Sequence, residues 1–106
     1  MNKAPHISPG FYYHYKHDLS GEINTYSYEV LGISFHTEDR TYAVTYRPLY
    51  KNTFLQGADF CVRPYEMFIE DVEVDGRKVP RFSKISDPVT ISHLERIKTE
   101  MYAKIA

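Results

Sequence analysis

The stretch Phe60-Cys61-Val62-Arg63-Pro64-Tyr65-Glu66-Met67-Phe68 combines a strand pattern with a proline stop. Apolar and polar side chains alternate over residues 60–63, which predicts a β-strand there. Pro64 ends the run, because it holds the preceding residue extended and lacks a backbone donor. The guanidinium of Arg63 is therefore fixed at a strand end, with the carboxylate of Glu66 just beyond it. Such a corner either faces a ligand or closes a small barrel through an ion pair.

Three earlier segments alternate in the same way, and we expect them to be strands. They cover residues 11–15, 26–36 and 41–50. Gly32, in the middle of the second, predicts a bulge or a bend. Pro48, near the end of the third, predicts an edge position or a bulge. The polar stretches between the strands are expected to be loops, namely residues 17–25, 37–40 and 51–59.

A hairpin is the clearest local signal after this point. Asp75-Gly76 separates two short alternating runs and predicts a two-residue turn. The register that this turn imposes places Val72 opposite Val79 and Glu73 opposite Lys78. Continued outward, the same register pairs Asp71 with Pro80, Glu70 with Arg81 and Ile69 with Phe82.

The end of the chain changes to a period of 3.6 residues, which predicts an amphipathic helix. Its start is either Ser92, which has capping-box spacing, or Asp87-Pro88. Lys98 lies inside the apolar arc and has to extend its amine toward solvent. A single helix of this length is marginal in water, so it must dock on the open side of the barrel or pair with its copy. The stripe available for a homodimer is Ile91, Leu94, Ile97, Met101 and Ile105.

These segments predict a mainly β fold: a small SH3-like barrel or roll of five to six strands with a C-terminal amphipathic α-helix. We expect residues 1–10 to form a flexible N-terminal arm. The barrel domain is then expected over residues 11–85, and the helix over residues 86–106.

Composition bounds the setting of the protein. The chain has 106 residues, of which 42% are hydrophobic and 15% aromatic, enough for one buried core. A net charge of -1 gives no electrostatic attraction to nucleic acid or to an anionic membrane, so neither is an expected partner. The lone cysteine, Cys61, excludes an internal disulfide and suits a reducing compartment. We therefore expect a soluble cytoplasmic protein without a signal peptide or a membrane span.

A series of short motifs follows in order along the chain: His14-Tyr15-Lys16, Tyr28-Glu29-Val30-Leu31-Gly32, His36-Thr37-Glu38, Val44-Thr45-Tyr46, Leu49-Tyr50, Val62-Arg63-Pro64-Tyr65-Glu66-Met67-Phe68, Val74-Asp75-Gly76 and Val79-Pro80-Arg81-Phe82. Together they resemble the bacterial family known as domain of unknown function 1653, over about residues 11–85. The resemblance implies an SH3-like barrel roll and supplies no reaction. Two departures are a longer loop at residues 17–25 and Cys61, where the family usually has Trp.

Arg63 is the first candidate for a binding site, because a fixed guanidinium suits bidentate binding of a carboxylate or phosphate. Tyr46 and Tyr50, with Tyr15 nearby if the barrel closes, can stack a planar ligand. The structural alternative for the tyrosines is a half-buried strand face. The structural alternative for Arg63 is an internal pair with Glu66, with Glu70 or with a backbone carbonyl.

A second set of candidates is His36 and Glu38, which share an alternation phase at a strand end and could act as base and orienter. Their alternative role is that of solvated turn residues. No Cys/His spacing supports a metal, Cys61 fits a small buried position, and no cofactor motif is present.

We accordingly expect a non-catalytic binding module for a small anionic or planar ligand or a protein partner. The site residues are Arg63, Tyr46, Tyr50, Tyr15, His36, Glu38 and Glu66, with no metal and no cofactor. The alternatives are an assembly protein that dimerises through its helix, and a small hydrolase-like enzyme using His36 and Glu38.

Overall fold

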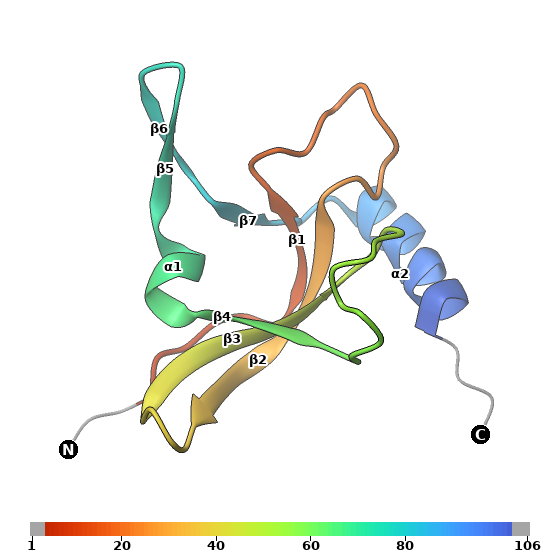
Figure 1. Ribbon diagram of the computed structural model, residues 1–106. Coiled ribbons are helices and arrows are strands. Elements are labelled where there is room, and N and C mark those ends of the chain that lie inside the picture. Colours follow the sequence, from red (N-terminus) through yellow and green to blue (C-terminus); the bar gives the residue numbers. More distant parts are fainter. Residues whose placement is uncertain (1–3, 103–106) are drawn as a thin grey trace.

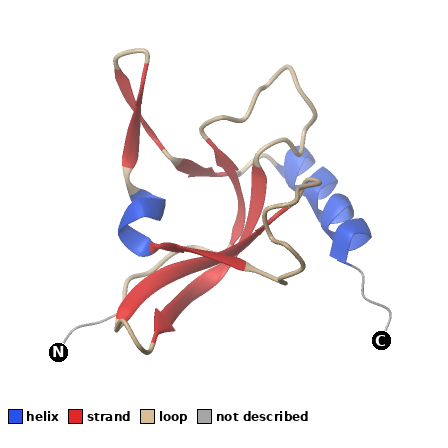
Figure 2. Ribbon diagram, viewed as in Figure 1, coloured by secondary structure: helices blue, strands red, loops and turns tan. Residues whose placement is uncertain are grey.

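The computed structural model describes residues 4–102 and has a curled antiparallel sheet at its centre (Figure 1). The sheet order is β4-β3-β2-β1-β7. Its strands are β1 (Gly10–His14), β2 (Ser27–His36), β3 (Thr41–Pro48), β4 (Cys61–Pro64) and β7 (Phe82–Lys84). A separate hairpin and two helices complete the fold (Figure 2): α1 (Tyr65–Ile69), β5 (Asp71–Val74), β6 (Arg77–Pro80) and α2 (Pro88–Tyr102).

The mainly β, barrel-like class with a C-terminal helix is confirmed, although the described residues form seven strands instead of five or six. The extra strand arises because the predicted second hairpin strand breaks at Arg81. β6 ends at Pro80, and Phe82 then pairs with His14 of β1 in the main sheet. The hairpin itself projects away from the sheet (Figure 1).

The predicted hairpin register is confirmed from the turn outward to Asp71 and Pro80. The next predicted pair, Glu70 and Arg81, lies just beyond this ladder. It is still joined by a backbone bond, in which the Arg81 N–H donates to the Glu70 carbonyl at 3.1 Å. The pairing of Ile69 with Phe82 is wrong, since the chain leaves the strand direction before Glu70 and forms α1.

Helix α1 follows Pro64 directly and turns Phe68 into the sheet. Phe68 is only 1% exposed, while Met67 and Ile69 on the same turn remain exposed. The Phe68 ring stacks on Phe82 with centroids 4.1 Å apart and meets Tyr46 edge-on at 5.6 Å. One helical turn therefore fills the space between the two edge strands β4 and β7.

Gly32 marks the predicted bulge. The register between β2 and β3 shifts between Val30 and Gly32, so that Val30 opposes Tyr46 and Ile33 opposes Val44. Because of the extra residue, Val30 and Ile33 both face the inner core despite being three apart. Leu31 is turned outward and is exposed. A bulge of this kind increases local twist and curls the sheet.

Pro48 occupies the edge position that its missing donor requires. On one side it opposes Tyr28 of β2, but the pairing of β3 with β4 extends only as far as Tyr46 and Cys61. β3 therefore extends beyond the end of its pairing with β4 at this point, and no ladder hydrogen bond is lost.

The sheet is buried on both faces, as adjacent residues Phe11 and Tyr12 show by joining different cores. The inner core, inside the curl, contains Tyr12, Tyr28, Val30, Val44, Tyr46, Phe68 and Phe82. The outer core, between the sheet and α2, contains Phe11, Leu49, Ile85 and Leu94. At the N-terminal end, Ile7 packs on the inner core and the Tyr12 hydroxyl donates to the Ser8 carbonyl at 2.7 Å.

Helix α2 begins at the earlier of the two predicted starts. The Asp87 carboxylate accepts a bond from the Thr90 backbone N–H at 2.9 Å, which caps the helix, and Pro88 occupies the first turn. Lys98 does not simply reach solvent, because its amine contacts the Glu29 carboxylate at 3.1 Å. This contact ties the helix to β2.

The apolar stripe of α2 packs on the chain's own sheet. Leu94 is fully buried, and Ile91, Ile97 and Tyr102 pack around the outer core. Met101 is partly exposed, and Ile105 lies outside the described residues. A homodimer through this stripe stays a prediction.

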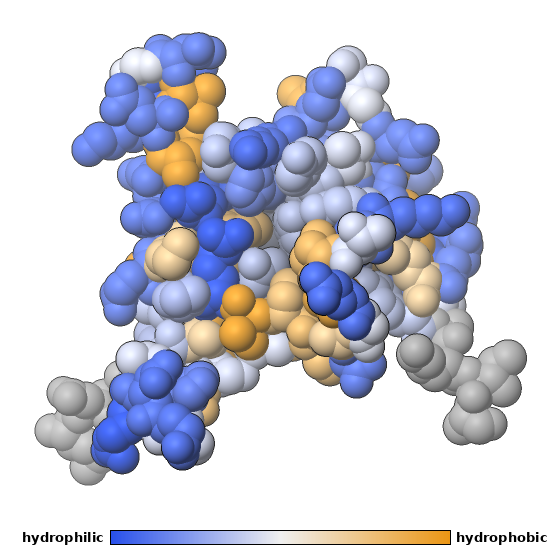
Figure 3. Space-filling view, viewed as in Figure 1, coloured by the Kyte–Doolittle hydropathy of each residue, from blue (hydrophilic) through white to orange (hydrophobic). Residues whose placement is uncertain are grey.

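Polar residues dominate the molecular face in Figure 3, and hydrophobic residues gather there in separate small groups. Within residues 4–102, no helix has the length and apolar character that crossing a bilayer requires.

Candidate functional site

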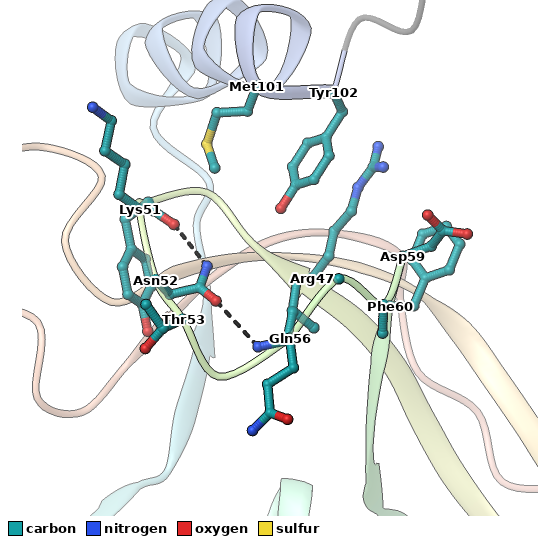
Figure 4. A pocket seen from close by; sticks show the side chains of 13 residues that line it. Arg47, Lys51, Asn52, Thr53, Gln56, Asp59, Phe60, Met101 and Tyr102 are labelled. Atoms are coloured by element: carbon teal, nitrogen blue, oxygen red, sulfur yellow. Dashed lines mark hydrogen bonds between the residues drawn. The ribbon is translucent and has the colours of Figure 1, made fainter.

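Two cavities open beside the loop that joins β3 to β4. The loop–helix cavity, of about 970 Å³, lies between this loop and the end of α2. Figure 4 shows Met101 and Tyr102 projecting from α2 toward Arg47 and the loop, with Phe60 on the far wall. The sheet cavity, of about 740 Å³, lies at the mouth of the curled sheet.

The loop–helix cavity has its central charge neutralised within the chain. The Arg47 Nε donates to Glu29 at 2.8 Å, and its guanidinium lies over the Tyr102 ring at 3.9 Å from the centroid. The Asn52 side chain is used to shape the loop, through bonds to the Tyr50 carbonyl and the Leu55 backbone N–H (Figure 4). The remaining polar side chains of its lining are Lys51, Thr53, Gln56 and Asp59, so groups of both charge signs border this cavity.

The sheet cavity has a different lining, with cations and aromatic rings. Its basic groups are His14, Lys16 and Arg63. The remaining lining residues are Tyr26, Tyr28, Tyr46, Tyr50, Asn52, Thr53, Phe54, Cys61 and Val62. Among the described residues that form this wall there is no Asp or Glu. The sheet cavity is therefore the candidate site.

Arg63 crosses the open side of the curled sheet. Its Nε donates to the Tyr46 hydroxyl at 3.2 Å, and its guanidinium lies 5.6 Å from the centroid of Phe82 on the opposite edge strand. The expected alternative, an ion pair with Glu66 or Glu70, does not occur in the described part of the chain. Glu70 instead binds Arg81 at 2.6 Å. The Arg63 charge thus faces the cavity without a carboxylate partner.

Tyrosines form the floor and one wall of the cavity. Tyr46 is 6% exposed and belongs to the inner core, while its hydroxyl reaches Arg63. The Tyr28 and Tyr50 hydroxyls bond to each other at 2.6 Å. Burial raises the pKa of all three phenols, so they stay neutral at physiological pH. The tyrosines therefore pack in or against the inner core and also line the sheet cavity.

His14 lies at the rim, at the end of β1. Its Nδ1 accepts the Lys16 backbone N–H at 3.2 Å, and its ring packs against Tyr15, Tyr26 and Phe82. Burial lowers the pKa of His14 to about 4, and the charges of Arg63, Lys16 and Arg81 act in the same direction. The imidazole is therefore neutral at physiological pH.

Cys61 contributes a small, partly buried side chain to the wall. Its Sγ donates to the Tyr46 carbonyl at 3.2 Å. Burial raises the pKa of the Cys61 thiol, so the thiolate needed for nucleophilic attack is disfavoured.

The other predicted site residues lie outside this wall. Tyr15 is at the rim, where its ring contacts His14 at 4.5 Å between centroids. Glu66 is exposed in the first turn of α1. His36 is the exposed last residue of β2 and Glu38 lies in the exposed turn that follows; the His36 Nδ1 accepts the Asp39 backbone N–H at 3.0 Å. The fold brings Arg63, Tyr46 and Tyr50 together, and Tyr15 beside them.

The sequence did not identify His14, Lys16, Tyr26 and Tyr28 as site residues. A signal was present, because Tyr12 and His14 share a face of β1 and Tyr12 opposes Tyr28. Alternation along one strand does not show which strands pair. The pairing of β1 with β7 places this face opposite Arg63. Within residues 4–102, no three His, Cys, Asp or Glu side chains are grouped so as to hold a metal ion.

The His14 environment predicts a pH-dependent stability. The unfolded chain binds a proton at His14 below about pH 6.5, whereas the folded chain binds it only near pH 4. Proton uptake thus favours the unfolded state as the pH falls through this window. We expect His14→Gln to remove about 1 kcal/mol of the acid-induced loss in unfolding free energy, after solvent screening.

Urea unfolding at pH 7 and pH 4.5 measures this difference. His93→Gln, at an exposed position of α2, is the matched control and should keep the wild-type pH dependence. Equal pH dependence of the wild type and His14→Gln would contradict the buried, cation-flanked position of His14.

Comparison with known proteins supplies a family and a fold. No curated protein matches the chain. A crystal structure of a DUF1653 protein from Bordetella bronchiseptica is similar, with 28% sequence identity and a TM-score of 0.60. The similarity covers 76% of this chain and 88% of that chain. The family described as "Protein of unknown function (DUF1653)" matches residues 10–84, which run from the first residue of β1 to the last of β7. The resemblance read from the motifs is confirmed, and the chain belongs to the DUF1653 family.

Proposed function

We propose that the protein is a non-catalytic binding module that holds a small planar anion in the sheet cavity. The observation that carries the proposal is the position of Arg63. Its guanidinium faces a tyrosine-lined cavity and has no carboxylate partner within the described residues.

An anionic ligand would satisfy this arrangement energetically. A partly buried cation loses hydration and regains stability from a charge-assisted hydrogen bond, which is about twice as strong as a neutral one. Only one guanidinium nitrogen, Nε of Arg63, bonds to a side chain of the described residues. The remaining N–H groups can therefore bind a ligand.

The aromatic wall adds a surface for a flat group. Tyr26 and Tyr50 lie with ring centroids 5.8 Å apart, and Phe54 is 50% exposed at the rim. Stacking of a planar group on such rings contributes about 1–3 kcal/mol in nucleic-acid binding proteins. The wall and the cation together fit one ligand that carries a ring and a negative charge.

The protonation states of the cavity favour binding over acid–base catalysis. A general acid or base works best with a pKa near the working pH. The pKa of His14 is about 4, and burial raises the pKa of Tyr46 and of Cys61. Each group therefore keeps one protonation state around neutral pH.

We place this module in a bacterial cytoplasm. Cys61 is present as a free thiol, which suits a reducing compartment.

Titration calorimetry with 2-naphthoate, a planar anion, tests the proposal against uncharged 2-naphthamide. The wild type should bind the anion and discriminate against the amide. Loss of a charge-assisted bond costs about 1.5–3 kcal/mol, so Arg63→Ala should weaken naphthoate binding about 10- to 100-fold. Cys61→Trp, which fills the cavity wall with a large ring, should also block binding.

Arg77→Ala is the matched control, because Arg77 is exposed on the β5–β6 hairpin and lies outside the cavity. Its affinity should equal that of the wild type. Naphthoate binding that survives both Arg63→Ala and Cys61→Trp, in variants that unfold at the wild-type temperature, would refute this site.

A further inference from the structure

We infer that the anion bound in the sheet cavity is a phosphomonoester attached to an aromatic group, the chemistry of a nucleotide, and not a carboxylate. The inference rests on the proposed function, because it names the ligand class of the same site. Three features of the cavity support it: the hydrogen bonding of Arg63, the local charge and the aromatic rim.

The first feature is the bond between Arg63 and Tyr46. A carboxylate pairs best with a guanidinium through two parallel N–H···O bonds. One of the two forks that allow this includes Nε, and the Tyr46 hydroxyl already accepts from Nε at 3.2 Å. The terminal nitrogens of Arg63 remain for an oxyanion approaching end-on, a geometry open to a carboxylate and to a phosphate, so the second cation beside Arg63 decides between them. A phosphate has three acceptor oxygens around one centre, so one oxygen can accept from Arg63 while another contacts a second cation.

The second feature is the charge of the site. Arg81 is neutralised by Glu70 at 2.6 Å, whereas Arg63 and Lys16 have no carboxylate partner in the described chain. The imidazole of His14 beside them is neutral. The site thus presents about two positive charges, which a phosphomonoester dianion balances and a carboxylate balances only by half. Lysine is also a common phosphate ligand as a point charge.

The third feature is the rim. Phe54 and Tyr26 border the same cavity as Arg63, and Phe54 is half exposed without a packing role in either core. Exposed rings next to basic groups are the arrangement by which proteins stack bases while binding phosphate. The cavity, at about 740 Å³, is within the size range of ligand pockets.

Calorimetry with three probes that share one ring separates this inference from the proposed function. The probes are 2-naphthyl phosphate, 2-naphthoate and 2-naphthamide, at pH 8, where the phosphate is a dianion. We expect the phosphate to bind at least about 10-fold more tightly than the carboxylate, and the amide to bind weakest. Equal affinity for phosphate and carboxylate would overturn the inference and leave the proposed function standing. Binding of neither anion would overturn both.

Two variants test the structural reasons. Lys16→Ala should weaken the binding of naphthyl phosphate more than the binding of naphthoate, because it removes the second positive charge of the cavity. Tyr46→Phe should free the Arg63 Nε for side-on pairing with a carboxylate. The difference in affinity between naphthyl phosphate and naphthoate should therefore become smaller. Lys78→Ala, at an exposed hairpin position, is the control and should keep the wild-type preference. An unchanged phosphate preference in both test variants would overturn the assigned geometry.

A last calorimetric experiment identifies the source of the phosphate. It compares the affinities for adenosine, adenosine 5′-monophosphate and a short 5′-phosphorylated oligonucleotide. Tighter binding of the monophosphate alone assigns a free nucleotide. Equal binding of the phosphorylated oligonucleotide assigns a strand end. Adenosine binding as tightly as its monophosphate would overturn the inference, since the phosphate would then contribute nothing.

Discussion

Replacing Phe68 by alanine is expected to lower the free energy of unfolding by about 3–5 kcal/mol, a large part of the ~5–15 kcal/mol typical of a domain. Phe68 is 1% exposed, stacks on Phe82 at 4.1 Å and meets Tyr12 edge-on at 5.8 Å. It is the side chain by which α1 closes the gap between β4 and β7. The truncation leaves a cavity between β4 and β7, which are not paired with each other in the described part of the chain.

Chemical unfolding of Phe68→Ala and Met67→Ala gives the comparison that matters. Met67 lies on the same helical turn but is 43% exposed, so its truncation should cost well under about 1 kcal/mol. Phe68→Leu should fall between the two, because it retains most of the apolar volume. Similar losses for Met67→Ala and Phe68→Ala would show that α1 does not insert Phe68 into the inner core.

The position of Phe68 also shows where sequence reasoning reached its limit. Pro64 correctly predicted the end of β4, but a five-residue helix is too short to display a 3.6-residue period. The stretch after Pro64 therefore looked like an extension of the hairpin strand. The hairpin register near Asp75-Gly76 was predictable, because a two-residue turn fixes its neighbours, and that constraint weakens with distance from the turn.

The same contrast applies to the candidate site. Arg63 was recognisable because its constraint is local, a proline directly after it in the chain. His14 and Lys16 could be joined to it only through the pairing of β1 with β7, which brings residues from the two ends of the domain together. Net charge was equally uninformative, since a value of -1 averages over the chain and hides a cavity wall with basic groups and no described acidic residue.

Replacing Leu94 by alanine is expected to cost about 2–5 kcal/mol of unfolding free energy, because Leu94 is fully buried between α2 and the sheet. It packs in the outer core with Phe11, Leu49 and Ile85, which come from three separate parts of the chain. The polar contact of Lys98 with Glu29 lies beside this core and leaves it mostly apolar. The loss should therefore come from the cavity and from weaker docking of the helix.

Met101→Ala separates docking within one chain from dimerisation. Met101 and Leu94 both lie on the stripe predicted for a homodimer. Met101 is 37% exposed, whereas Leu94 is 0% exposed. If the helix is stabilised by its own sheet, Leu94→Ala costs several-fold more than Met101→Ala, and the wild-type urea midpoint is independent of protein concentration. A midpoint that rises with concentration, together with similar losses for the two variants, would instead assign the stripe to an interface between two copies. The complete burial of Leu94 within a single chain favours the first result, because a side chain without exposed surface has none left to offer a partner.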